Sequence, residues 1–342
     1  MQAMGIMNGI DKLVSGLTKR VKFYADGIGD REYLDGLPAY LREFDSGDLR
    51  PGDIVRGPER EEGGARIHEI SFETPFPDSV HPASRRGRIQ AVFPPEMSKD
   101  TPIVIHFAGT ADETFTPRRL GLAQPLLKHG IASLILENPY YGERRPPGQI
   151  GPAVRTLSDQ FRMNFATIIE GIAWLRQLHA EGYARLGVTG VSMGGSMAAS
   201  VAAWVDQEVA CAPCLAPYGP GPAYLKGVLR DGIDWTALEN TYAPAPGDSR
   251  SSFEYVSDVL AIPDLRGSDR PLPLRPDAVV MVGGSQDAYV LPESVEALHR
   301  HWAGSELRWV NAGHVTGVVL YHGEFRRAIR DSFERLARPV QA

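Results

Sequence analysis

The residues best suited to chemistry form the sequence G-V-S-M-G-G at Gly190–Gly195. An apolar run precedes it at 186–189, and an Ala-rich stretch with helical character follows at 196–204. Strand, sharp turn and helix around G-x-S-x-G are the context of a nucleophile elbow, which exposes a serine hydroxyl at the edge of a sheet. Glycines beside that serine have no Cβ, so strand and helix can approach closely. The pattern predicts that Ser192 is a nucleophile.

A serine nucleophile needs a base to take its proton and a carboxylate to orient that base. His314, in N-A-G-H, follows the last predicted strand, where a loop could return it to Ser192. Asp287 ends a Gly-rich loop just past an apolar strand; its alternative role is to cap the helix after Pro292. The three residues occur in the chain order Ser, Asp, His that is typical of α/β hydrolases. We therefore expect them to form a catalytic triad.

The oxyanion formed in such a reaction needs two backbone N–H donors. One is expected from Met193, the residue after the nucleophile. The other is expected from the loop after the predicted strand at 102–107, where Gly109 lets the backbone turn inward. Thr110 is the expected donor in this loop, and Ala111 is the alternative.

Composition narrows the class of protein. Of the 342 residues 43% are hydrophobic, which is ample for a packed core. The formal net charge is −6 and no part of the chain is strongly basic, which argues against nucleic acid as the main partner. Cys211 and Cys214, in C-A-P-C, lie in an apolar run, so we expect two strand thiols rather than a redox motif or a zinc site. No metal ion or other cofactor is expected.

The sequence shows few features that would target the protein to a compartment or a membrane. No signal peptide and no run of about 18 apolar residues is visible, so we expect a cytoplasmic protein without a transmembrane helix. Residues 4–23 form a basic amphipathic stretch with apolar residues at helical spacing. Such a helix could contact an anionic membrane surface, or it could pack on its own protein. The sequence does not indicate the oligomeric state.

The chain divides into two predicted parts. Residues 1–65 are expected to be a helical N-terminal extension, with the amphipathic helix, a second short helix near Tyr33–Phe44 and a polar loop. Residues 66–342 are expected to form an α/β domain, because apolar strands alternate with helices as in a mostly parallel sheet covered on both faces. Strands are predicted at 66–72, 87–93, 102–107, 131–136, 186–189, 209–216, 278–282 and 307–310. Helices are predicted at 120–129, 157–180, 196–204, 293–302 and 323–337.

The alternation breaks at about 219–275, a stretch rich in Pro, Gly and aromatic residues between two core strands. A loop this long is usually functional. We expect a cap or lid over the active site; the alternative is a surface excursion without substrate contact. Tyr140 and Tyr141 follow the strand at 131–136 and should face the same sheet edge as Ser192. One of them is expected to line the substrate pocket, unless both pack as loop anchors.

Several segments together resemble the alpha/beta-hydrolase domain-containing protein 18 family over about residues 100 to 335. They are H-F-A-G-T-A-D at 106–112, L-E-N-P-Y-Y-G at 136–142, G-V-S-M-G-G at 190–195, Q-D-A-Y-V at 286–290, and G-H at 313–314 followed by F-R-R-A-I-R-D-S-F-E-R. The resemblance implies an α/β-hydrolase fold and places the nucleophile, acid and base on Ser192, Asp287 and His314. It also implies action on acyl esters, with lipids as one candidate. The family usually has a second Gly after G-T, where this chain has Ala111.

Residues and resemblance together predict a metal-independent serine hydrolase that cleaves carboxylic esters. The substrate could be a lipid ester, a small acyl ester or a polyester. A serine peptidase or an acyltransferase would use the same triad, but no group that binds a peptide terminus can be identified. A non-catalytic hydrolase fold that binds a ligand or partner is the alternative from another class. Such proteins usually lose a triad member, whereas here all three are present in order.

Overall fold

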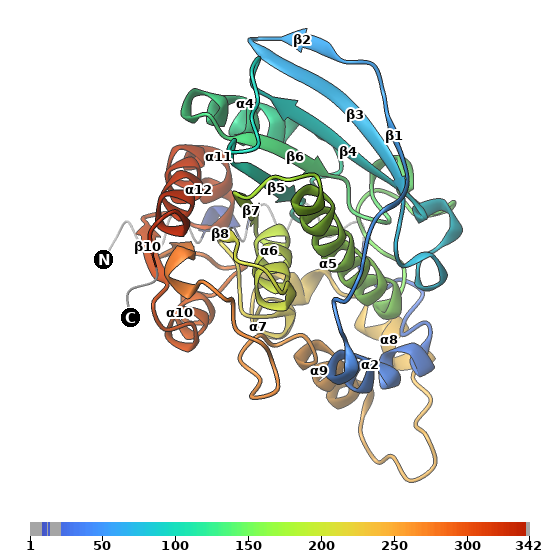
Figure 1. Cartoon of the computed structure of the whole chain (residues 1–342). Coiled ribbons are helices and arrows are strands. Elements are labelled where there is room, and N and C mark those ends of the chain that lie inside the picture. The colour runs from blue at the N-terminus through green and yellow to red at the C-terminus, as the bar shows by residue number, and fades with distance from the viewer. Residues whose placement is uncertain (1–8, 12, 14–21, 340–342) are drawn as a thin grey trace.

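The computed structural model describes residues 9–11, 13 and 22–339 (Figure 1). Most of the helix predicted at 4–23 lies outside these residues; residues 9–11 and 13 are helical. The second N-terminal helix is confirmed as α2 (Arg31–Glu43). The polar loop expected after it is wrong in part, because the strands β1 (Gly52–Arg56) and β2 (Arg60–Glu62) pair with β3 (Ala65–Glu73). Both are largely exposed edge strands, so their sequences lack the apolar alternation that reveals a strand.

One sheet runs through the molecule in the order β1-β3-β4-β6-β5-β7-β8-β9-β10, with β2 alongside β3. The other strands are β4 (Arg86–Phe93), β5 (Ile103–Phe107), β6 (Ala132–Leu136), β7 (Leu186–Val191), β8 (Ala210–Cys214), β9 (Val280–Gly284) and β10 (Glu306–Val310). Neighbours are antiparallel from β1 to β6 and parallel from β6 to β10. The carboxyl ends of β5 to β10 therefore meet at one edge, and the predicted mostly parallel sheet is confirmed.

Helices cover both faces of the sheet (Figure 1). On one face lie α5 (Leu157–Ala180), α6 (Met193–Trp204) and α10 (Pro292–His301), and on the other lies α12 (His322–Leu336). The alternation along β8 separates its two thiols, because Cys211 packs on the α6 side and Cys214 on the α12 side. Both are buried and free, as strand thiols are expected to be.

The helix predicted at 120–129 is broken into short pieces. They are α3 (Thr116–Arg118), a π-helical turn (Arg119–Ala123), α4 (Gln124–Leu126) and a 3-10 turn (Leu127–His129). Pro125 cannot donate to a carbonyl four residues back, so a regular helix cannot continue through it. The Gly121 carbonyl instead accepts a hydrogen bond from Arg326 at 2.7 Å. Other 3-10 turns are at Pro77–Ser79, Pro82–Ser84, Gly142–Arg144, Val228–Gly232 and Pro276–Ala278.

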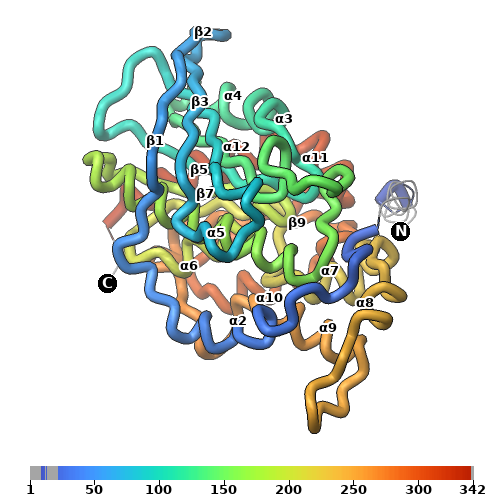
Figure 2. Tube along the Cα trace, turned by 90° about the vertical axis from the view of Figure 1, so that its right-hand side faces the viewer, coloured from blue at the N-terminus to red at the C-terminus, as the bar shows by residue number. Residues whose placement is uncertain are grey.

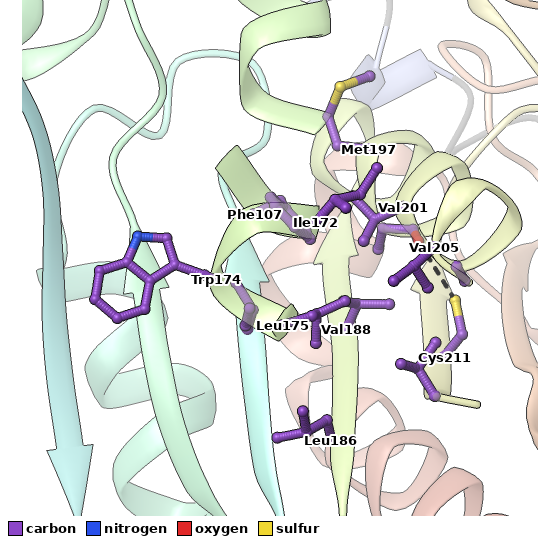
Figure 3. Close-up of a cluster of buried hydrophobic side chains, with 14 of the residues drawn as sticks. Phe107, Ile172, Trp174, Leu175, Leu186, Val188, Met197, Val201, Val205 and Cys211 are labelled. Atoms are coloured by element: carbon purple, nitrogen blue, oxygen red, sulfur yellow. Dashed lines mark hydrogen bonds between the residues drawn. The ribbon is translucent and has the colours of Figure 1, made fainter. Parts of the chain in front are cut away.

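The main core lies between the sheet and α5 and α6 (Figure 3). Phe107 of β5, Val188 of β7 and Val201 of α6 are among its fully buried members. Gly171 lets α5 approach, because a Cβ there would lie 2.6 Å from the Phe107 ring. This close approach holds α5 against the sheet, with Val201 of α6 3.0 Å from the same Cβ position.

A second core joins the N-terminal segment to the insertion at 219–275. The insertion folds as α7 (Pro220–Leu225), α8 (Trp235–Thr241) and α9 (Ser252–Ala261). Buried Leu34 of α2 belongs to one cluster with Leu238 of α8, Val256 of α9 and Phe161 of α5. Figures 1 and 2 both show α2, α8 and α9 together at one end of the molecule. The role of the insertion as a cap, and the domain boundary at residue 65, stay predictions.

Candidate active site

Ser192 lies in the turn between β7 and α6, as the sequence predicts. Its backbone has φ 59° and ψ −123°, a conformation that a side chain adopts only under strain. The Ser192 N–H donates to the Cys214 carbonyl at 2.9 Å, which holds the turn against β8. A Cβ on Gly190 would lie 2.3 Å from the Gly194 backbone, and one on Gly194 would lie 2.3 Å from the Phe107 carbonyl. These close approaches explain why both positions carry glycine.

Asp287 and His314 meet at the same edge of the sheet. His314 is the first residue of α11 (His314–Leu320), and its Nδ1 lies 2.6 Å from Asp287 Oδ2. The other oxygen, Asp287 Oδ1, accepts the N–H groups of Tyr289 at 2.8 Å and Val290 at 2.7 Å. Asp287 does not cap α10, whose N-cap Leu291 has no side-chain cap bond, so this alternative is excluded. The imidazole nitrogen left for a serine proton is Nε2.

Strand order brings the nucleophile to this pair. Ser192 follows β7, Asp287 follows β9 and His314 follows β10, and these strands are parallel members of one run. Within the described residues, no hydrogen bond joins the Ser192 hydroxyl to His314. Catalytic hydrogen bonds are often long before substrate binds and shorten in the reacting complex. The aromatic ring of Tyr289 stacks on the His314 ring, with centroids 5.0 Å apart, and supports the imidazole from one side.

The loop after β5 lies against the elbow, as the expected oxyanion hole requires. The Thr110 hydroxyl contacts Met193 Sδ at 3.9 Å, and a Cβ on Gly109 would lie 2.9 Å from the Val191 carbonyl. Ala111 adopts φ 70°, in the left-handed region that favours glycine. Among the described loops, the Thr110 N–H takes part in no backbone hydrogen bond. Its role as an oxyanion donor, with Met193, stays a prediction.

A buried arginine that the sequence did not single out fixes the shape of this loop. Arg118 donates to the carbonyls of His106 at 3.1 Å and Leu136 at 2.6 Å, which end or nearly end β5 and β6. Its Nε forms an ion pair with Asp112 Oδ2 at 2.6 Å. Burial raises the pKa of the Asp112 carboxyl, and the Arg118 charge opposes that shift. The only sign of this ion pair in the sequence was Asp112, the last residue of H-F-A-G-T-A-D.

Tyr140 and Tyr141 both pack inside the loop after β6. Tyr140 is 2% exposed, and its hydroxyl donates to Asp159 at 3.0 Å. Tyr141 is 1% exposed; burial raises the pKa of its phenol, and the neighbouring Ala111 N–H opposes this shift. This arrangement matches the alternative of loop anchors, with Tyr141 touching the oxyanion loop from behind. A direct role of either in substrate binding stays a prediction.

An apolar pocket with about 60 Å³ of free space lies along α6. Its walls come from α2, α5, α6 and the segments at 218–220 and 262–270. Ser196 and Met197 of its lining are one turn from Ser192, and Tyr218 follows β8 at the same sheet edge. Gln160 lies between the nucleophile turn and the pocket. Its side chain contacts Met193 Sδ at 3.8 Å and donates to Asn164 of the pocket wall at 3.0 Å.

The described part of the chain holds no group of three or more His, Cys, Asp or Glu side chains arranged to bind a metal ion. Of the helices within that part, none is both long and apolar enough to cross a membrane.

The sheet order, the two helical layers and the elbow define an α/β-hydrolase fold. The chain matches the family described as "Alpha/beta hydrolase domain containing 18" over residues 21–262 and 268–335. It therefore belongs to this family, and the resemblance seen in the sequence is confirmed.

Solved structures with the same fold include two esterases. Acetyl xylan esterase 1 from Thermoanaerobacterium sp. is similar with a TM-score of 0.59 and 15% identity, over 94% of this chain and 98% of that one. The acetyl xylan esterase from Paenibacillus sp. is similar with a TM-score of 0.60 and 14% identity, over 93% of this chain and 98% of that one. At these identities the likeness concerns the fold, and the alignment spans almost the whole of each chain.

Proposed function

We propose that the protein is a serine hydrolase that cleaves carboxylic esters through an acyl-enzyme. The observation that carries the proposal is the 2.6 Å contact between His314 Nδ1 and Asp287 Oδ2 at the sheet edge where Ser192 occupies a strained elbow. A carboxylate that holds Nδ1 leaves Nε2 free to act as a base. Family membership supports hydrolysis as the type of reaction.

In the proposed mechanism, the Ser192 hydroxyl attacks the acyl carbon and His314 Nε2 takes its proton. Charge on the carbonyl oxygen is stabilised by the N–H groups of Met193 and Thr110. The tetrahedral intermediate collapses as the leaving alcohol receives the proton from His314. A water molecule then attacks the acyl-enzyme with His314 again acting as base, and the carboxylic acid leaves. Asp287 orients the ring and stabilises its cationic form throughout.

The pocket along α6 suggests where the acyl group would go. A cavity of about 150 Å³ holds a benzene ring of six carbons, so a space of about 60 Å³ corresponds to roughly two to three carbons. Apolar walls suit the methylenes of an acyl chain rather than a charged alcohol. We infer that esters with short acyl chains are accepted best. A lipid ester stays a candidate substrate if the rest of its chain extends out of this pocket.

A series of p-nitrophenyl esters with acyl chains of two to sixteen carbons tests the proposal. Wild type should hydrolyse them, Ser192→Ala should lose at least about 10³-fold in kcat/KM, and the optimum should lie at short chains, near two to four carbons. Ser332→Ala is the matched control, because Ser332 is also a buried helix serine that donates to a backbone carbonyl, that of Ile329, and it lies on α12 on the other face of the sheet. Turnover that survives in Ser192→Ala would contradict the mechanism, and a flat chain-length profile would contradict the role of the pocket.

A further inference from the structure

Asp11 belongs to the described part of the N-terminal helix. Its carboxylate lies buried between the segments that carry Asp287 and His314. Asp11 is 0% exposed. Its Oδ2 accepts the N–H of Ala288 at 3.1 Å and the N–H of His314 at 2.7 Å. Its Oδ1 accepts the N–H of Val315 at 2.9 Å. One side chain thus bridges the residue after the proposed acid and the proposed base itself.

The first of these N–H groups has no acceptor within its own loop. Asp287 uses Oδ1 to accept the N–H groups of Tyr289 and Val290, which leaves the Ala288 N–H to be satisfied from elsewhere. Asp11 supplies that acceptor from a position 277 residues earlier in the chain. The acid-bearing loop therefore depends on Asp11 to complete its backbone hydrogen bonds.

The other two N–H groups belong to the first turn of α11. N–H groups in the first turn of a helix have no partner within the helix and need an acceptor from outside. Gly313, just before the helix, has Thr316 Oγ1 as its own acceptor at 3.0 Å, whereas His314 and Val315 share Asp11. A carboxylate is a strong acceptor for backbone N–H groups, and both oxygens of Asp11 are used by these three bonds.

We propose that Asp11 is a positioning residue that holds His314 and Asp287 in the geometry needed for proton transfer. The two segments that it joins follow different strands, β9 and β10. Backbone hydrogen bonds from Ser285 to Val310 and from Gln286 to Ala312 join them just before the triad residues, and Asp11 joins them at Ala288 and His314. A displacement of about 1 Å between reacting groups can cost about 10²-fold in rate. Asp11 would act through His314 and Asp287 without touching the substrate. The effect on turnover rests on the proposed ester hydrolysis.

Two variants of the full chain test the proposal. Asp11→Asn preserves the shape of the side chain but turns one acceptor oxygen into an N–H₂ donor that faces backbone N–H groups. Asp11→Ala removes both acceptors. We expect kcat for a p-nitrophenyl ester to fall about 10- to 100-fold in Asp11→Asn, with KM within about 2-fold of wild type, because substrate binding is untouched. The low-field proton NMR resonance of His314 Nδ1–H should move or disappear in the same variant.

Asp30→Ala is the matched control. Asp30 also accepts a backbone N–H at a helix start, that of Tyr33 in α2, and it lies in the N-terminal segment outside the proposed active site. This variant should lower the thermal midpoint yet retain wild-type kcat and the His314 resonance. If Asp11→Asn folds and keeps both kcat and the resonance, the proposal is overturned. The same conclusion follows if Asp30→Ala loses as much kcat as Asp11→Asn.

The resonance separates this proposal from the proposed function. If wild type shows no Ser192-dependent turnover, the ester-hydrolase assignment fails. The Nδ1–H signal of His314 would then still test the positioning role of Asp11, because this signal reports the hydrogen bond from His314 to Asp287 and needs no substrate. Loss of that signal in Asp11→Asn would support the positioning role, and an unchanged signal would contradict it. If Asp11→Ala fails to fold, Asp11→Asn alone carries the test.

Discussion

Individual side chains already make hydrogen bonds that the proposed chemistry needs. Asp287 Oδ2 lies 2.6 Å from His314 Nδ1, and in the proposed mechanism it accepts the Nδ1–H and leaves Nε2 for the serine proton. The Asp287 carboxylate is held in place, because the N–H groups of Tyr289 and Val290 donate to its other oxygen. Ser192 carries the backbone strain of the elbow. In the proposed mechanism these three features set the direction of proton transfer, from Ser192 to His314 Nε2.

Asp287→Asn tests that direction. The amide is almost the same size but presents an N–H₂ or a neutral oxygen to the ring, so the tautomer with the proton on Nε2 becomes favourable. We expect kcat to fall by about 10³- to 10⁴-fold while the fold is retained, as seen for this kind of substitution in serine proteases. Stopped-flow or steady-state assays, with circular dichroism on the same samples, measure both. A loss below about 10-fold would mean that Asp287 does not orient the base.

His106 predicts an effect of pH on stability. Burial lowers the pKa of His106 to about 3, and its Nε2 lies 3.0 Å from Ser133 Oγ. The unfolded chain takes up a proton at about pH 6.5 whereas the folded chain does not, so stability is present above pH 6.5 and is lost as pH falls toward 3. One such proton contributes about 1.4 kcal/mol per pH unit to the slope of the unfolding free energy.

His106→Gln should remove that contribution, because a glutamine has no proton to gain. Urea unfolding of wild type and variant at several pH values between 4 and 7 measures the difference in slope. His129→Gln is the control, because His129 is exposed at the end of a 3-10 turn. Parallel slopes for wild type and His106→Gln would show that the buried imidazole does not govern acid sensitivity.

At the scale of elements, a buried ion pair ties the loop after β6 to α5. Arg144 and Glu170 make two hydrogen bonds of 2.6 and 2.9 Å, with side chains 1% and 0% exposed. Arg144 also donates to the carbonyls of Ser84 and Glu137, so one guanidinium joins three segments. These contacts of Arg144 hold the loop that carries Tyr140 and Tyr141 in place behind the proposed oxyanion hole.

Arg144→Met should destabilise the protein by about 3–5 kcal/mol, because Glu170 becomes a buried charge without a partner. In the double variant Arg144→Met/Glu170→Leu that charge is gone, and part of the stability should return. Urea midpoints of the three proteins give the comparison. A double variant no more stable than Arg144→Met would show that the unpaired charge is not the cause of the loss.

Elements with strong local patterns could be predicted from the sequence. The helix α5 was predicted at its observed bounds, because its 24 residues are amphipathic or apolar throughout and begin after the Thr156 cap. The triad could be proposed for a similar reason, since a glycine-bounded serine and loops after apolar strands are local features. The edge strands β1 and β2 have no such pattern, and their pairing to β3 depends on contacts across the sheet.

The missed residues act over long distances in the chain. Asp11 lies 303 residues from His314, and nothing around it in the sequence distinguishes it from a solvated charge on a helix. Arg118 was equally hidden, because its meaning comes from carbonyls at the ends of two different strands. The break of the helix near Pro125 could have been predicted from proline chemistry, and was not.

At the scale of the whole molecule, α2 of the N-terminal segment and the insertion at 219–275 share one buried cluster. Side chains of α2, α5, α8 and α9 form this cluster. A hydrogen bond also joins α9 to α2, because the Tyr255 hydroxyl donates to Asp35 at 3.0 Å. Arg31 adds an ion pair with Asp248 at 2.9 Å. These contacts predict that the N-terminal segment unfolds together with the hydrolase domain.

Leu34→Ala tests this coupling, because Leu34 of α2 is fully buried in the shared cluster. We expect it to lower the free energy of unfolding by about 2–5 kcal/mol in a single transition. Leu120→Ala should change it by less than about 0.5 kcal/mol, because Leu120 is 55% exposed. A separate early transition in Leu34→Ala, with the main midpoint unchanged, would mean that the segment folds independently.

The central claim is that Ser192 performs covalent chemistry with His314 as its base. A fluorophosphonate reacts with a serine only when a base activates it, so the most direct measurement is the mass of the labelled peptides after digestion. We predict a single adduct on the peptide that contains Ser192 and a large loss of labelling in His314→Ala. Labelling of another residue, or equal labelling of Ser192 in wild type and His314→Ala, would contradict the account.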